Sequence, residues 1–572
     1  MSGAALLAVP LVPLLLAVFI GLRPGRARLN RLVPWAALPG LALAALAPPG
    51  LEATLSGLLM GTHLAVDPTG RAFLGLTAGL WLAAGLFALS DRRDDPRRHR
   101  FYVFWLLALA GNLGLILAQD AIAFYLFFSL MSLSAYGLVI HSGKPEAWRA
   151  GRVYLILAVL GEVLLFAGLV LAVHAAGQSS LAAVAAARPE GWALVLLVLG
   201  LGIKAGMLPL HFWLPLAHPA APVPASAVLS GAMIKAGLLG WMRLLPIDAA
   251  GHAVLGEALV LLGLAAAFLG VLVGVLQVRP KTLLAYSSIS QMGLMTTGIG
   301  LALLLPEARG WLLAAVTLYA VHHGLAKGAL FLTAGMQRQW PVTRPARTAF
   351  ALFTLLPALA LAGLPFTSGA LAKNALKEPL AAEALSGWLA HTEWLLTLAA
   401  AGTTVLLLRF LWRWRADLET AADGLDRPRW WAWGGLSLMA LLLPLATLLA
   451  GPTALPLSVH DLYGSSLLWP VMLGLGLALL AWRGVRDRET PRVPEGDLAV
   501  LAEAAWDGAR RTRRRLALPG PWPPRIPARM RALRLGARRR LEAAERMLTR
   551  WETIGLLFSA AMLGLYLTLL AG

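Results

Sequence analysis

Long apolar segments, separated by short polar connections, follow one another along almost the whole 572-residue chain. Each holds about 17 to 25 residues, enough for a helix to cross a hydrocarbon core of about 30 Å at about 1.5 Å per residue. The pattern predicts an all-α, polytopic membrane protein with about sixteen transmembrane helices. The predicted spans are residues 3–22, 32–48, 70–90, 101–118, 121–140, 152–175, 190–208, 225–245, 254–276, 282–304, 309–335, 347–380 (interrupted), 393–412, 430–451, 466–483 and 553–571.

Basic residues are concentrated in every second connection between these spans. Arginine-rich connections at 23–31, 91–100 and 413–430 alternate with connections that carry almost no Lys or Arg, apart from Arg188 and Arg309. By the positive-inside rule the basic connections are cytoplasmic, so both termini are expected on the outer side of a bacterial-type cytoplasmic (inner) membrane. Membrane topology therefore accounts for the net charge of +20, and no nucleic acid partner is expected.

The composition agrees with a membrane protein and excludes several other classes. Hydrophobic residues make up 59% of the chain and charged residues 14%, and the mean hydropathy is +0.72. The sequence has no cysteine, which excludes Cys-ligated iron–sulfur clusters, a C-x-x-C-H haem site and disulfides. Its eleven histidines form no H-E-x-x-H-type cluster, and it contains no P-loop. No cofactor and no metal site are expected, and the chain is not expected to carry electrons.

Lysine is rare and unevenly placed. Only seven of the 49 Lys and Arg residues are lysines, and arginine dominates the connections. Four of the lysines, Lys204, Lys235, Lys327 and Lys373, fall within apolar spans. A charge inside the bilayer costs several kcal/mol and usually faces the protein interior. Because a desolvated lysine can release its proton whereas an arginine stays charged, the choice of lysine favours proton transfer.

An acid and two histidines lie in equally apolar surroundings. Glu162 is near the middle of its span, and His322 and His323 precede Lys327 in another. His323 and Lys327 are four residues apart and so share one helix face, and histidine exchanges protons near neutral pH. The residues that would form a proton relay across successive helices are Glu162, Lys204, Lys235, His323, Lys327 and Lys373. The alternative is that the lysines are structural and snorkel to an interface or bind a carbonyl group.

Two of the lysine-bearing spans contain helix-breaking residues. Lys204 is followed by Pro209, and Lys373 follows Gly363 and Pro365. Irregular backbone at membrane depth is tolerated only where it is buried in protein or lines a wet cavity. Each lysine lies in the fourth of five spans in a block, and an odd number of spans reverses the orientation of the second block. This arrangement predicts two inverted five-helix repeats, each with a broken helix.

The predicted spans divide the chain into six parts. These are an N-terminal three-helix segment (1–100), a first inverted repeat or half-channel (101–245), a second inverted repeat or half-channel (254–412), two additional transmembrane helices (413–484), a basic amphipathic cytoplasmic segment (485–551) and a final transmembrane helix (552–572).

Four stretches of the sequence resemble a known family of membrane proteins, the antiporter-like proton-translocating subunits. One begins at Lys204 and reads KAGMLPLHFWLPLAHPAAPVPASAVLSGAMIKAGLLGWMRLLP. The others are VDPTGRAFL at 66–74, PKTLLAYSSISQMGLM at 280–295 and HHGLAKGALFL at 322–332. The family includes large membrane subunits of respiratory complex I (NADH-quinone oxidoreductase), of hydrogenase-4 and formate hydrogenlyase, and of Mrp-type cation/proton antiporters.

The resemblance implies roles for the members of the predicted relay. Lys204 corresponds to the broken-helix lysine of the first half-channel, and Lys235 to the lysine that bridges the two halves. His323 and Lys327 correspond to the family's His/Lys helix. Lys373 corresponds to the terminal lysine of the second broken helix.

The acid of the first half-channel departs from the family pattern. Members usually carry a glutamate in the helix before Glu162, paired with the broken-helix lysine, and here Ser129 stands at that position. Glu162 itself matches an acid that many members carry after a glycine. Either Glu162 is the counter-charge to Lys204, or the first half-channel is impaired. Gln291 likewise stands where many members have histidine.

The segment before the last span carries an amphipathic pattern. Apolar residues recur there every three or four positions on an Arg-rich helix, namely Ile526, Met530, Leu533, Ala537, Leu541, Ala544, Leu548 and Trp551. A helix on the cytoplasmic interface near anionic lipid is expected. The resemblance implies that it braces its own subunit or one neighbour, because PGPWPP at 519–524 interrupts the segment.

As a whole, the resemblance implies a proton-translocating subunit of a multisubunit complex of the complex I or membrane-bound hydrogenase type. Its partners would be other membrane subunits, the lipid bilayer, and protons or Na⁺. At most, the chain is the proton-pumping subunit of such an enzyme, with no redox chemistry of its own. Two alternatives stay open: an Mrp-type Na⁺/H⁺ antiporter subunit, or a partner subunit of the same fold that energises uptake of another solute such as inorganic carbon. Ser129 favours the last of these.

Overall fold

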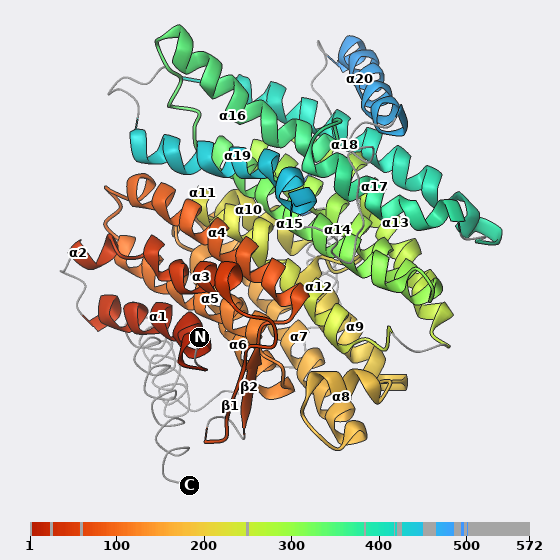
Figure 1. Cartoon of the computed structure of the whole chain (residues 1–572). Coiled ribbons are helices and arrows are strands. Elements are labelled where there is room, and N and C mark those ends of the chain that lie inside the picture. The colour runs from red at the N-terminus through yellow and green to blue at the C-terminus, as the bar shows by residue number, and fades with distance from the viewer. Residues whose placement is uncertain are drawn as a thin grey trace, which may run out of the picture.

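Long helices lying side by side make up most of the molecule (Figure 1). The computed structural model describes residues 3–22, 27–57, 61–247, 251–382, 385–416, 418–419, 426–449, 465–485, 493–496 and 500. Over these residues the chain is helical apart from its connections and one short β-hairpin. The predicted all-α fold class is therefore confirmed.

The elements follow the predicted spans closely. They are α1 (Gly3–Leu22), α2 (Ala27–Asn30), η1 (Pro34–Ala37), α3 (Leu38–Leu46), β1 (Glu52–Leu55), β2 (Thr62–Ala65), α4 (Pro68–Asp91), α5 (Arg98–Leu117), α6 (Ala121–Val139), α7 (Pro145–Ala176), α8 (Leu181–Ala186), α9 (Gly191–Ala205), α10 (Trp213–Ala220), α11 (Val223–Val228), η2 (Leu229–Met233), α12 (Lys235–Leu244), α13 (Ala253–Val275), α14 (Pro280–Leu304), α15 (Arg309–Ala334), α16 (Arg344–Ala362), α17 (Ser368–Ala382), η3 (Gly387–His391), α18 (Thr392–Arg415), α19 (Arg427–Leu449) and α20 (Ser465–Val485). Each predicted span up to 466–483 coincides with one helix or with consecutive helical segments. The last span, 553–571, lies outside the described residues.

Many of these helices are suited to a bilayer. In the described part of the chain, ten are long and apolar enough to cross a membrane by length and composition. The protein is a multi-pass membrane protein. The count of sixteen spans and the two inverted repeats stay predictions.

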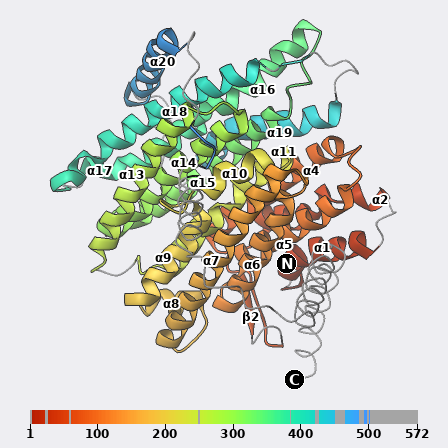
Figure 2. The same ribbon diagram turned by 180° about the vertical axis from the view of Figure 1, so that it is seen from behind.

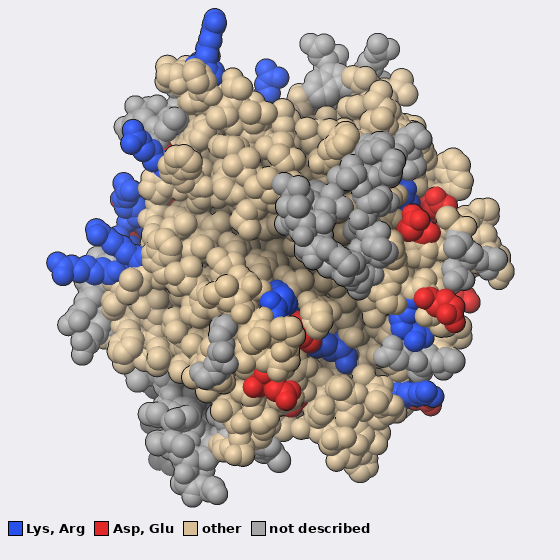
Figure 3. Space-filling view, in the orientation of Figure 1, with Lys and Arg blue, Asp and Glu red and all other residues tan. Residues whose placement is uncertain are grey.

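Charged side chains are distributed unevenly over the surface. In Figure 3, Lys and Arg gather along the left edge of the molecule, which we call the basic edge, while uncharged side chains cover most of the face beside it. The connection between α4 and α5, with the arginines of residues 91–100, belongs to the basic connections of the sequence. A broad apolar surface beside a basic edge is the distribution expected of a membrane protein with its positive charges on one side.

The helices are arranged in two groups with a short central set between them. Figures 1 and 2 both place α10, α11 and α12 between the red to orange helices of the N-terminal part and the green helices α13, α14 and α15. Helix α11 and η2 pack against both α4 and α15, and α12 packs against α9. The central set therefore joins the two groups.

The hairpin fixes the ends of two long helices. Strands β1 and β2 pair in antiparallel register, and Leu64 forms a further bridge to Ala118. Asp120 caps α6 by accepting a hydrogen bond from Ala123 N at 2.8 Å, and it also accepts one from His63 N at 2.9 Å. A capping carboxylate satisfies main-chain N–H groups that the first helical turn leaves without partners.

Both predicted helix breaks are present, and each begins with a glycine. Helix α9 ends at Ala205, and Gly206 follows with a φ of 74°. Helix α16 ends at Ala362, and Gly363 follows with a φ of 89°. Glycine adopts positive φ without the Cβ clash that other residues suffer, so it ends both helices and lets the chain turn. The chain resumes as α10 after the first break and as α17 after the second.

Candidate functional site

The six predicted relay residues are all buried. We call them the relay row: Glu162 on α7, Lys204 on α9, Lys235 on α12, His323 and Lys327 on α15, and Lys373 on α17. None of their side chains is more than 8% exposed. Glu162 is the one acid among these residues. A buried charge without a partner is costly, so the contacts of each lysine decide what the row can do.

Lys204 lies in the last turn of α9, beside the first helix break. Its Nζ donates a hydrogen bond to the Tyr154 hydroxyl at 3.2 Å, and that hydroxyl donates to Ser132 O at 2.8 Å. Lys204 and Tyr154 also border a small cavity together with Ser132 and Trp213. The lysine therefore has a hydroxyl partner and adjacent empty space.

Glu162 faces the same region from α7. Its carboxyl group lies within electrostatic reach of Lys204 and next to the Ser129 side chain. Within the described residues, however, neither Glu162 Oε1 nor Ser129 Oγ has a hydrogen-bond partner of ordinary geometry. The structure therefore brings Glu162 next to Ser129, the position at which family members usually carry the glutamate.

Hydrogen-bonded serine and carbonyl groups lie between Lys235 and Lys327. Lys235 Nζ donates to Ser230 O at 2.6 Å, and Ser230 Oγ shares a hydrogen bond of 2.7 Å with Ser288 Oγ. Ser288 Oγ donates to Leu284 O at 3.0 Å, and Lys327 Nζ donates to the same carbonyl at 2.7 Å. Groups of η2 and α14 therefore lie between two buried lysines, Lys235 on α12 and Lys327 on α15.

Close helix packing holds Lys204 and Lys235 on neighbouring helices. Gly237 lies so near α9 that a Cβ there would stand 2.4 Å from Leu201 O and 2.7 Å from Ala205 N. A side chain would push the two helices apart. The glycine therefore allows α12 to approach the end of α9 that carries Lys204.

Two buried histidines lie near these lysines with free ring nitrogens. In the described part of the chain, both ring nitrogens of His323 and both of His218 have no hydrogen-bond partner. Each side chain is 0% exposed, and each lies within electrostatic reach of Lys235 and Lys327. The His218 ring stacks on Phe331 with ring centroids 4.6 Å apart.

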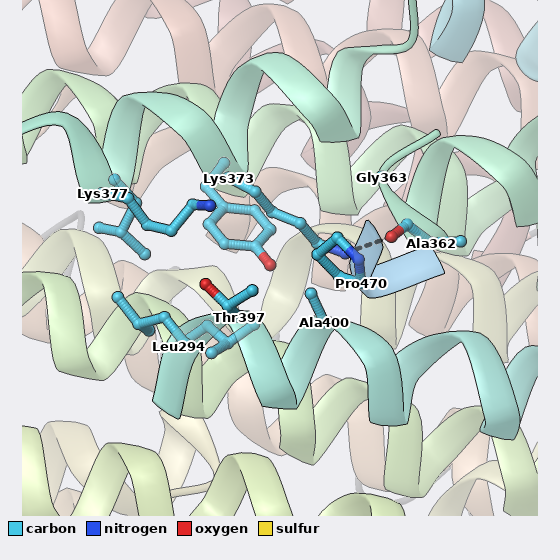
Figure 4. A pocket seen from close by; sticks show the side chains of 11 residues that line it. Leu294, Ala362, Gly363, Lys373, Lys377, Thr397, Ala400 and Pro470 are labelled. Carbon is cyan, nitrogen blue, oxygen red and sulfur yellow. Dashed lines mark hydrogen bonds between the residues drawn. The ribbon is translucent and has the colours of Figure 1, made fainter. Parts of the chain in front are cut away.

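Lys373 lies on α17, just after the second break. Its Nζ donates to Leu361 O at 2.9 Å and to Ala362 O at 2.8 Å, both at the C-terminal end of α16. It borders a cavity with Lys377 of the same helix and Thr397 and Ala400 of α18 (Figure 4). The negative end of a helix dipole favours a cation there.

His322 connects α15 to α17. Its Nδ1 and Ser368 Oγ share a hydrogen bond of 2.7 Å, and Ser368 Oγ donates to Ala440 O at 2.7 Å. Because the serine proton is directed at Ala440 O, Nδ1 of His322 is the donor to Ser368. His322 Nε2 has no partner within the described residues.

Gln291, which stands where many family members have histidine, is firmly held. Its Oε1 accepts from the Tyr319 hydroxyl at 3.0 Å, and its Nε2 donates to Thr403 Oγ1 at 3.0 Å. The amide therefore ties α14 to α15 and α18, and it has no proton to exchange at physiological pH.

Several polar residues near the relay row were not predicted from the sequence. Tyr154 gave no signal, since a single hydroxyl in an apolar helix is common. Lys281 lies at the start of α14 and donates hydrogen bonds to Pro219 O and Ala221 O. His218 and Lys281 both lie inside the stretches that carry the family resemblance, and their positions next to Pro219 and Pro280 were the available signal. Among the described residues, no group of three or more His, Asp or Glu side chains could hold a metal ion.

The comparison with protein families agrees with these features. Residues 118–397 match the family model described as NADH:quinone oxidoreductase/Mrp antiporter, TM. Over these residues, the chain is similar to that antiporter-like family. The matched region includes every member of the relay row and both helix breaks. The family resemblance predicted from the four sequence stretches is therefore confirmed.

Curated relatives come from more than one branch of this antiporter-like family. The chain is 34% identical to hydrogenase-4 component B of Escherichia coli (strain K12) over 245 residues, which are 41% of this chain and 36% of that protein. It is 31% identical to NADH-quinone oxidoreductase subunit N of Desulforudis audaxviator (strain MP104C) over 287 residues, 48% of this chain and 56% of that protein. The chain thus spans about half the length of these relatives, or less.

A solved structure shares the fold over nearly the whole chain. It is the structure of Mrp complex from Dietzia sp. DQ12-45-1b, with a TM-score of 0.74 at 22% identity. The similarity covers 95% of this chain and 63% of that chain. At this identity the comparison concerns the antiporter-like fold alone.

Proposed function

We propose that the chain translocates protons along the relay row as a subunit of a multisubunit membrane complex. The observation that carries the proposal is the hydrogen-bonded connection from Lys235 through Ser230 and Ser288 to Lys327. It sets hydroxyl and carbonyl groups, which can hold water in line by hydrogen bonds, between two buried amines.

Each member of the row has a distinct task in this proposal. Lys204 accepts a proton in the cavity beside the first break and exchanges it with the Tyr154 hydroxyl. Glu162 acts as the counter-charge that favours the protonated lysine. His323 carries the proton between Lys235 and Lys327, because its two ring nitrogens allow uptake at one and release at the other. Lys373 receives it at the second break.

The complex is of the NADH-quinone oxidoreductase or hydrogenase type. Support comes from the relatives, which are named hydrogenase-4 component B and NADH-quinone oxidoreductase subunit N. In such a complex the chain itself carries out no redox step, and other membrane subunits are its partners. An Mrp-type Na⁺/H⁺ antiporter subunit is the alternative that the Mrp-like fold supports.

The test of the proposed function is proton uptake by vesicles that contain the native complex. Lys204→Met removes the amine that the relay needs, so uptake should fall to background while the complex still assembles. Lys144→Met is the matched control, because Lys144 is exposed in the connection between α6 and α7. Full uptake with Lys204→Met would contradict the proposal.

We further propose that the basic edge faces the cytoplasm in a bacterial-type inner membrane, with both termini outside. The alternation of basic and charge-poor connections supports this orientation. Reporters fused within 91–100 and 413–430 should indicate the cytoplasm, and reporters within 246–253 and 453–465 the outside. A cytoplasmic signal from 453–465 would contradict the topology with sixteen spans.

The division into parts is proposed on the same grounds. The two inverted repeats would span 101–245 and 254–412, after a three-helix segment at 1–100 and before two further helices at 413–484. The matched glycine breaks beside Lys204 and Lys373 support this pairing. The amphipathic segment 485–551 and the span 552–572 lie almost wholly outside the described residues.

A second candidate function rests on Ser129. A serine at the position of the usual glutamate leaves the first half-channel with Glu162 as its acid. The chain would then serve as a partner subunit that shares the fold and energises uptake of another solute, such as inorganic carbon. Identifying the subunits of the purified native complex separates the two candidates.

A further inference from the structure

A short piece of the polar segment after α20 is seated on the ends of three helices. It comprises residues Val493–Gly496. Glu495 Oε1 accepts a hydrogen bond from Thr282 Oγ1 at 2.8 Å, and Glu495 Oε2 lies 3.5 Å from Arg279 Nη1. Gln277 Nε2 donates to Val493 O at 3.4 Å. The contact therefore joins this piece to the turn between α13 and α14 and to the first turn of α14.

The other side of the piece lies against α10. Gly496 is buried, and a Cβ there would stand 2.8 Å from the Leu216 side chain. Leu216, Gln277 and Thr282 are each no more than 6% exposed. The residues that the piece contacts are therefore themselves shielded from solvent.

Two titratable groups that the relay row does not include are close neighbours of these contacts along the chain. His218 is two residues after Leu216 on α10, and Lys281 directly precedes Thr282 on α14. Lys281 holds the backbone after His218 through its bonds to Pro219 O and Ala221 O. His218 is 0% exposed with both ring nitrogens unpartnered in the described part of the chain, and it lies within electrostatic reach of Lys281 and Lys327.

We propose that Val493–Gly496 is a plug, formed by the chain itself, that limits the access of water and protons to His218. The docking itself is independent of transport, whereas its effect on proton access rests on the proposed function. Glu495 is a positioning residue in this proposal: it fixes the plug through Thr282 and does not itself carry protons. Arg279 contributes little, because its side chain is 56% exposed and solvent screens the pair.

Cysteine labelling tests the docking, because the chain contains no cysteine of its own. Leu216→Cys places a thiol under the plug, and Lys144→Cys places one on an exposed site in the connection between α6 and α7. Both are made in the full chain within the native complex, in inverted vesicles, and treated with a membrane-impermeant maleimide. With Glu495 present, the Leu216→Cys site should react slowly and the Lys144→Cys site quickly.

Adding Glu495→Ala should raise the labelling rate at the Leu216→Cys site by about tenfold, the size expected from losing a charge-assisted hydrogen bond. Glu495→Gln should raise it less, because the amide oxygen still accepts from Thr282 Oγ1. The rate at Lys144→Cys should not change. Equal rates at Leu216→Cys with and without Glu495 would overturn the plug, and so would a parallel rise at both sites, which would indicate general loosening.

The effect on proton access needs a second readout. Without the cysteine substitutions, Glu495→Ala should increase the passive proton permeability of the vesicles. Faster labelling with unchanged permeability would overturn the access part of the proposal and leave a docked segment only. Proton uptake that persists in Lys204→Met would instead contradict the proposed function, and it would leave the labelling result intact.

Discussion

The two broken helices hold their lysines in different ways. Lys204 donates to a tyrosine hydroxyl and has a carboxylate, Glu162, nearby. Lys373 donates to two main-chain carbonyls at the end of α16, and no acid of the relay row accompanies it. In the first half, the groups nearest the ammonium group of Lys204 are side chains, and a side chain such as Glu162 can gain or lose a proton. In the second half, the groups that accept hydrogen bonds from Lys373 are main-chain carbonyls, which do not titrate.

This difference indicates a division of labour within the proposed relay. A lysine balanced by a titratable acid can be switched, because protonating Glu162 would weaken its hold on the Lys204 charge. The carbonyl groups of a helix terminus, by contrast, carry partial charges that do not titrate. We therefore expect the first half to respond to events elsewhere in a complex, and the second half to act as a constant acceptor.

The largest expected effect separates a proton carrier from a fixed charge. Lys204→Arg keeps the positive charge but cannot release a proton at physiological pH, so proton uptake by vesicles with the complex should fall to background. Lys373→Arg should have the same effect if both halves carry protons. Full uptake with Lys373→Arg and none with Lys204→Arg would show that the second lysine supplies charge only.

The next effect tests the acid of the first half. Glu162→Gln should abolish most of the proton uptake, because Lys204 loses its counter-charge. Adding Ser129→Glu should restore part of it, since Ser129 lies next to Glu162 and faces the same region. Wild-type proton uptake by the Glu162→Gln variant would show that Lys204 needs no acid. The two halves would then not differ in this respect.

A smaller effect is expected from the hydroxyl partner of Lys204. Tyr154→Phe removes the acceptor at 3.2 Å and the donor to Ser132 O. A neutral hydrogen bond contributes about 1 kcal/mol, so the rate of proton uptake should fall by about fivefold. Phe preserves the ring that packs against Trp213. A loss as large as that of Lys204→Met would instead identify the hydroxyl as an obligatory carrier.

The smallest effect concerns the second half. Ser368→Ala removes the hydrogen bond that holds His322 between α15 and α17. Because Lys373 is held by α16 and not by His322, proton uptake should change by about twofold or less. The free energy of unfolding should fall by about 1 kcal/mol. The matched control is Thr348→Ala, an exposed hydroxyl on α16. A large loss of uptake would place His322 in the relay.

The sequence predicted the helices and the buried lysines well, for a physical reason. A span of apolar residues has few alternatives to a helix in a bilayer, and Lys204 or Lys373 inside such a span must face the protein interior. The two breaks followed from Gly and Pro residues that act locally. Tyr154, Ser230 and Ser288 could not be predicted, because their contacts depend on which helices become neighbours. The position of Val493–Gly496 was equally inaccessible, since four residues carry no periodic pattern.

The π-helical turn η2 has a consequence for the register of the central helices. Ile234 N donates to Leu229 O at 3.2 Å, across five residues, so this turn holds one residue more than an α-helical turn. An α-helix advances by about 100° per residue. In a regular α-helix of the same sequence, α12 would therefore be rotated by about 100° relative to α11, and Lys235 would point in a different direction. The hydropathy of the span and its length would hardly change. The direction in which Lys235 points thus depends on one extra residue in this turn. Two chains of nearly identical composition could therefore direct the same lysine toward different helices of the bundle.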